Sequence, residues 1–81
     1  MNVSSTPVVE RIARVLVARN ASANASGEDL SAGPIVDELW ADFREDAIAV
    51  LRTLREPDAA MARAGDPVVW EKMILAAIGE G

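Results

Sequence analysis

The clearest pattern of hydrophobic and polar positions runs from Pro34 to Arg55. Its apolar residues recur at steps of three and four, so they share one face of a helix with a period of 3.6 residues. Pro34 suits the first helical position, and Glu56-Pro57 ends the helix because the residue before a proline is pushed out of the helical region. The pattern predicts one long amphipathic helix over residues 34–55. Its apolar face consists of Ile35, Val36, Leu39, Trp40, Phe43, Ala47, Val50, Leu51 and Leu54.

Three further helices are predicted by shorter stretches of the same periodicity. In the first, Glu10 lies four residues before Arg14, a spacing at which the two side chains can form an ion pair. In the last, Asp66 is a suitable N-cap, Pro67 suits the first helical position and Gly79 suits the C-terminal end. The predicted helices cover residues 7–19, 58–64 and 67–78.

A segment rich in Ala, Ser, Asn and Gly, residues 20–33, separates the first two helices. Its low complexity predicts a long loop, and its one large apolar side chain, Leu30, is expected to contact the core. Residues 1–6 are expected to form a flexible tail, and residues 7–79 a single helical domain. The predicted fold is all-α: a compact bundle of three longer helices and one short helix, with the long loop between helices 1 and 2.

The composition narrows the possible chemistry. The 81 residues include no Cys and no His, which removes disulfides, thiolate metal sites and the commonest general base. A net charge of −5 disfavours nucleic acid as a partner, because binding it relies on Lys and Arg that replace counterions. No apolar run approaches the ~20 residues of a membrane span, and no signal peptide is visible, so the cytoplasm is the expected location. We expect no cofactor, no metal site and no enzymatic activity.

Acidic residues are concentrated in the first half of the 34–55 helix and form a candidate partner-binding surface; a solvated acidic face is the alternative. Like charges four residues apart repel mildly, and a metal ion could offset this, but carboxylates from one helix alone rarely enclose an ion. Trp40 and Trp70 lie on apolar faces, where tryptophan is either core or a binding hot spot. Met61 and Met73 are expected to fill gaps in the core. The candidate partner-binding residues are Asp37, Glu38, Asp42, Glu45, Asp46 and Trp40.

About half of the chain carries a string of scaffold residues, Trp40-x-x-Phe43-Arg44 and later Trp70-x-x-Met73-Ile74. This string resembles small uncharacterised all-α proteins of alphaproteobacterial and phage-like origin. Because the residues that match are mainly apolar, the resemblance implies a shared fold and no particular activity.

The stretch before the central helix, Glu28-Asp29-Leu30-Ser31-Ala32, is similar to the stretch before the modified serine of acyl and peptidyl carrier proteins. The order of a first helix, a long loop, a central helix and a short third helix also resembles those carriers. The position of the modified serine is Pro34 here, and a proline cannot carry phosphopantetheine. Only Ser31, three residues earlier, could substitute for it. The resemblance therefore implies a carrier-like layout with degenerate chemistry.

These observations favour a non-enzymatic, acidic protein–protein interaction module, and the first resemblance implies a relation to phage proteins. Its expected surface is the acidic half of the central helix with an apolar groove beside it, and its expected partner is another protein. Self-association into a homo-oligomer is a subsidiary hypothesis. The alternative function is a degenerate carrier protein that would use Ser31, and the third is a helical nucleic-acid-binding module.

Overall fold

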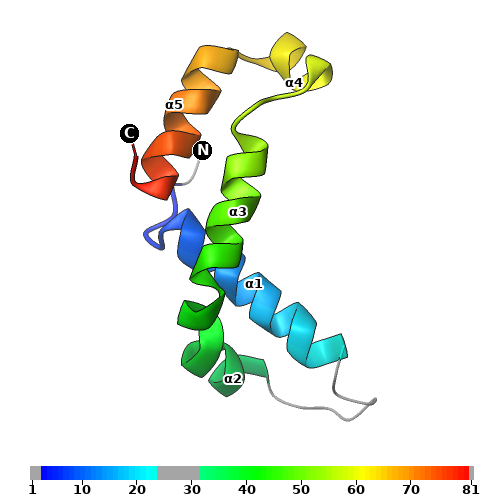
Figure 1. Ribbon diagram of the computed structural model, residues 1–81, viewed down its shortest axis with the longest axis vertical. Helices are drawn as coiled ribbons and strands as arrows, with labels where there is room; N and C mark the ends of the chain where they lie inside the picture. Colours follow the sequence, from blue (N-terminus) through cyan, green and yellow to red (C-terminus); the bar gives the residue numbers. More distant parts are fainter. Residues whose placement is uncertain (1–2, 24–31, 81) are drawn as a thin grey trace. The chain divides into compact units, whose positions relative to one another are not determined.

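The structure, a computed structural model, describes residues 3–23 and 32–80 (Figure 1). Within these ranges the fold is all-α with no strand, as the sequence predicts. None of the helices described is long and apolar enough to cross a membrane. The helices in chain order are α1 (Val8–Ala23), α2 (Ala32–Leu39), the 3₁₀-helix η1 (Trp40–Phe43), α3 (Arg44–Leu54), α4 (Ala59–Ala64) and α5 (Pro67–Ile78).

The helix predicted over residues 34–55 is divided in the structure. α2 ends at Leu39, and the single 3₁₀ turn of η1 separates it from α3, which corrects the prediction of one continuous helix. Leu39 has φ −107° and ψ −8°, away from regular α-helical values. In a 3₁₀-helix residues three apart lie on the same side, and Trp40 and Phe43 keep this spacing in either kind of helix. The hydrophobic pattern alone therefore cannot reveal the interruption.

α1 continues to Ala23, four residues beyond the predicted end at residue 19. The alanines of this segment have the highest helix propensity, which favours extending the helix into the predicted loop. α2 begins at Ala32, so Pro34 is its third residue. Proline is tolerated there because the first four N–H groups of a helix have no intrahelical partner. The remainder of the predicted loop, with Leu30 and Ser31, lies outside the described residues.

The chain divides into two compact units, Met1–Ala47 and Ile48–Gly81, with the division inside α3. In the first unit α1 packs against both α2 and η1. The second unit holds the remainder of α3 with α4 and α5. Among the described residues, the buried hydrophobic side chains are Ala13, Val17 and Ala47 in the first unit and Leu51 and Ile74 in the second.

Candidate functional site

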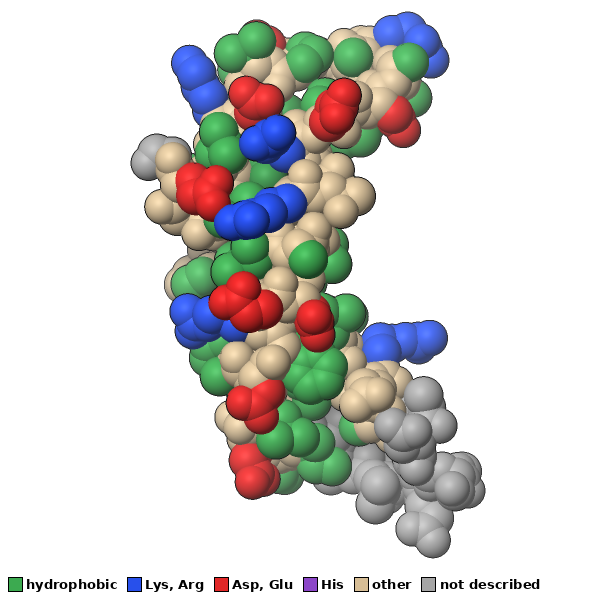
Figure 2. Space-filling view, in the orientation of Figure 1, with side chains coloured by type: hydrophobic (Ala, Val, Ile, Leu, Met, Phe, Trp, Pro, Cys, Tyr) green, Lys and Arg blue, Asp and Glu red, His purple; other side chains and the backbone are tan. Residues whose placement is uncertain are grey.

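The carboxylates predicted to bind a partner all lie at the surface of the first unit. Figure 2 shows acidic side chains among hydrophobic ones over the region of α2 and η1. No group of three such side chains in the described part of the chain could hold a metal ion. The exposed carboxylates are Asp37 and Glu38 from α2, Asp42 from η1, and Glu45 and Asp46 from the first turn of α3.

Arg14 on α1 binds carboxylates from two helices. Its Nε donates to Glu10 Oε2 at 2.8 Å, which confirms the pair predicted within α1. Its Nη1 donates to Asp37 Oδ1 at 2.6 Å and so joins α1 to α2. The hydrogen bond to Asp37, followed by that to Glu10, raises the pKa of Arg14 above its ordinary value because both stabilise the charged guanidinium. Asp37 therefore already has a cationic partner within the chain.

Trp40 is half-buried and lies close to two arginines. The guanidinium carbon of Arg44 is 5.3 Å from the centroid of its ring, and that of Arg14 is 5.7 Å away. Cations within about 6 Å of an indole ring are attracted by its quadrupole. Trp40 thereby helps to position Arg14 between Glu10 and Asp37, which gives it a structural role in the first unit.

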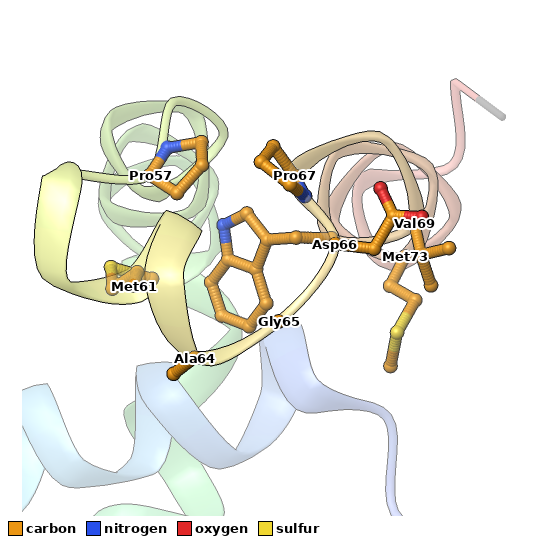
Figure 3. Close-up of a pocket in the computed structure, with 9 residues that line it drawn as sticks. Pro57, Met61, Ala64, Gly65, Asp66, Pro67, Val69 and Met73 are labelled. Atoms are coloured by element: carbon orange, nitrogen blue, oxygen red, sulfur yellow. The ribbon is translucent and has the colours of Figure 1, made fainter.

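The second unit contains an apolar groove of about 390 Å³, which we call the α4–α5 groove (Figure 3). Met61 from α4 and Met73 from α5 lie on opposite sides of it. These methionines are 37% and 61% exposed, so they line a surface groove and do not fill gaps in the core as the sequence analysis expected. The groove is lined by Pro57, Met61, Ala64, Gly65, Asp66, Pro67, Val69, Trp70 and Met73.

Two aspartates fix the starts of the helices that form the groove. Asp58 Oδ1 accepts a hydrogen bond from the N–H of Met61 at 2.9 Å and caps α4. Asp66 Oδ1 accepts from the N–H of Val68 at 2.9 Å and caps α5, with Pro67 as the first helical residue. The start of α5 is therefore the one that the sequence predicts. Each cap satisfies an N–H that the helix itself cannot pair.

Two polar contacts attach α5 to α3. Trp70 Nε1 donates to the carbonyl oxygen of Leu54 at 2.6 Å, an oxygen at the end of α3 that has no partner within that helix. Arg52 Nη2 donates to Glu80 Oε1 at 2.7 Å. Glu80 is placed there by the end of α5, where Gly79 has φ 96° and the N–H groups of both residues donate back to the last turn. This is the Schellman arrangement, and it confirms the predicted helix end.

Sequence reasoning missed the α4–α5 groove because its lining comes from separate helices. One signal was available: Glu71 and Lys72 are the only charged residues in α5, so its apolar positions extend around most of the helix. A helix that is apolar on most sides is normally covered on more than one face. In the structure Ile74 is buried, whereas Val69 and Met73 remain exposed.

A smaller cleft of about 230 Å³ also lies in the second unit. Two arginines line it together with apolar residues and the carboxylate of Glu80, which is bound to Arg52. Its polar side chains are exposed at the surface, where ion pairs contribute little. The lining residues are Arg52, Arg55, Leu75, Ile78 and Glu80.

No protein-family model, curated protein or solved structure matches the chain. The resemblances to phage-like proteins and to carrier proteins therefore stay predictions. Ser31, the alternative attachment residue for a carrier, lies outside the described residues.

Proposed function

We propose that the chain is a non-enzymatic protein-binding module and that the α4–α5 groove is its principal binding site. The observation that carries this proposal is the exposure of large apolar side chains at the groove, with Val69 49% and Met73 61% exposed. Removing apolar surface from water contributes roughly 25 cal/mol per Å² of favourable free energy. A partner that covers these side chains therefore gains binding free energy at the groove. Methionine suits such a surface, because its flexible and polarisable side chain adapts to partners of different shape.

The acidic side chains of the first unit form a second proposed binding surface, which is separate from the groove. Glu38, Asp42, Glu45 and Asp46 are exposed and form no ion pair within the described residues. With the net charge of −5, they favour a basic protein partner and raise its rate of encounter at low salt. Together with Asp37 and Trp40, they are the partner-binding residues predicted from the sequence. The proposal requires no cofactor.

The first test captures partners with a tagged chain in the cells that naturally produce it. Three baits are compared by quantitative mass spectrometry: the wild type, Met73→Lys in the groove, and Val15→Lys on α1. Met73 and Val15 are 61% and 59% exposed, so both substitutions add the same charge at equally accessible positions. We expect the wild type and Val15→Lys to capture the same protein, and Met73→Lys to lose at least about nine-tenths of it. When the partner does not saturate the bait, this loss corresponds to about 1.4 kcal/mol of binding free energy.

Equal capture by all three baits would show that the groove does not bind the partner and would overturn the proposal. The intact mass of each bait is measured in the same experiment. A bait that carries a prosthetic group on Ser31 would replace the proposal with the carrier alternative. Capture of duplex nucleic acid that persists at physiological salt would replace it with the nucleic-acid-binding alternative.

A further inference from the structure

We infer that the α4–α5 groove receives a short amphipathic helix of a partner protein, which inserts two or three large apolar side chains and places a Lys or Arg beside Asp66. This inference rests on the proposed function and specifies the chemistry of the partner. Three properties of the groove support it: its lack of polar partners for an extended backbone, its size, and the position of its single charge.

The apolar lining favours a helix over an extended peptide. An extended chain carries unpaired backbone N–H and C=O groups, and these lose free energy when they are buried without hydrogen bonds. Asp66 is the only lining residue with a polar side chain other than the indole of Trp70, and that indole N–H already donates to Leu54. The described residues also contain no strand to which a peptide could add. A helix pairs its own backbone groups and presents only side chains, which suits such a groove.

The size of the groove favours a short segment over a second copy of the chain. Nine residues line it, whereas each side of a stable protein interface contributes about 20–30 residues. Its volume of about 390 Å³ falls in the range of small-ligand pockets and fits a few inserted side chains. Space for them is available next to Gly65, where a Cβ atom would meet no other atom within 4 Å.

The charge at the groove favours a basic residue on the inserted helix. Asp66 uses Oδ1 to cap α5, and its second carboxylate oxygen makes no hydrogen bond within the described residues. It is the only charged residue in the lining, so it is the group there with which a Lys or Arg of the partner could pair. Acidic partner helices are disfavoured for the same reason.

The experiment measures binding of labelled model peptides by fluorescence anisotropy. The probe is a peptide of about 18 residues, long enough to be helical, with leucines spaced three and four apart and lysines on the other face. A second peptide carries glutamate in place of every lysine, and a third carries a central proline that breaks the helix. We expect the lysine peptide to bind at least about tenfold more tightly than either of the others, a difference of about 1.4 kcal/mol.

Variants of the protein locate the binding. Gly65→Leu fills the groove without backbone strain, because Gly65 has φ −158° and open space around its Cβ position. We expect it to weaken binding of the lysine peptide at least about tenfold, whereas Val15→Lys changes the affinity less than about twofold. Asp66→Asn keeps the N-cap, since asparagine caps as well as aspartate. It should reduce the preference for lysine over glutamate while binding persists.

Several outcomes would overturn the inference. In one, the lysine and proline peptides bind with equal affinity; in another, Gly65→Leu binds the lysine peptide as tightly as the wild type does; in a third, the lysine peptide does not bind at about 1 mM. Each of these results alone is sufficient. A dimer in sedimentation that Gly65→Leu dissociates would assign the groove to a second copy instead. If the peptides fail but Met73→Lys still loses the captured cellular partner, the protein-binding function stands and only the helical, basic partner is wrong. If both fail, the proposed function fails as well.

Discussion

Val15 and Val17 on α1 offer a direct test of the fold, because they are identical residues in one helix with opposite environments. Val17 is 2% exposed and Val15 is 59% exposed. Substituting each by alanine removes the same two methyl groups. It also changes the intrinsic helix propensity by the same amount, so any difference between the two variants reports burial alone.

The expected magnitudes follow from these exposures. Each buried methylene equivalent contributes about 0.8 kcal/mol, so two fully buried methyl groups contribute about 1.6 kcal/mol at position 17 and about 0.7 kcal/mol at position 15. Alanine has a higher helix propensity than valine, and this offsets up to about 0.5 kcal/mol of the loss in both variants. We expect Val17→Ala to lose about 1–2 kcal/mol of unfolding free energy, including a cavity contribution, and Val15→Ala to stay within about 0.5 kcal/mol of the wild type.

Urea unfolding followed by far-UV circular dichroism measures both values. With a slope near 1 kcal/mol per M for a small chain, Val17→Ala should lower the midpoint by about 1–2 M and Val15→Ala by less than about 0.5 M. Tryptophan fluorescence is recorded in parallel, since coincident transitions justify a two-state analysis. Equal midpoints for the two variants would refute the burial of Val17 and, with it, the described packing of α1.

Two further predictions concern α5. Gly79→Ala should lower the unfolding free energy by about 1–2 kcal/mol, because Gly79 has φ 96° and a side chain is strained there. The control Gly65→Ala, at φ −158°, should change it by less than about 0.5 kcal/mol. Equal shifts of the melting temperature in the two variants would contradict the left-handed conformation of Gly79. Trp70→Phe removes the indole donor to the Leu54 carbonyl and should lose about 1 kcal/mol in urea unfolding. A variant as stable as the wild type would show that water replaces this hydrogen bond without loss.

Local signals in the sequence predicted the all-α fold and several of its boundaries. Asp66-Pro67 and Gly79 bound α5 as predicted, because an N-cap, a proline and a left-handed glycine act on their own backbone neighbours. The 3₁₀ turn at Trp40 escaped prediction, since a step of three between apolar residues fits both helix types. The extension of α1 to Ala23 escaped it because alanines give no amphipathic pattern.

The candidate site was less predictable, since its contacts join residues far apart in the sequence. The Glu10–Arg14 pair follows from a spacing of four and was predicted. The contacts of Arg14 with Asp37 and of Trp70 with Leu54 span 23 and 16 residues, and no local rule specifies them. Sequence reasoning chose the acidic residues as the candidate surface because charge is visible in composition. The predicted apolar groove lies beside the acidic half of the central helix, whereas the observed one lies between α4 and α5 and forms only when these two helices pack side by side.

The attachment of α5 to α3 has a consequence for the rigidity of the groove. A helix held at one point can still swing, whereas one held at two points is fixed in direction. Trp70 holds α5 near its beginning, and the buried Ile74 holds it about one turn further on. The ion pair of Arg52 with Glu80 is exposed and adds little to this. The wall that carries Met73 is therefore fixed by contacts that precede residue 79, and a tag fused beyond residue 80 should leave binding at the α4–α5 groove unchanged.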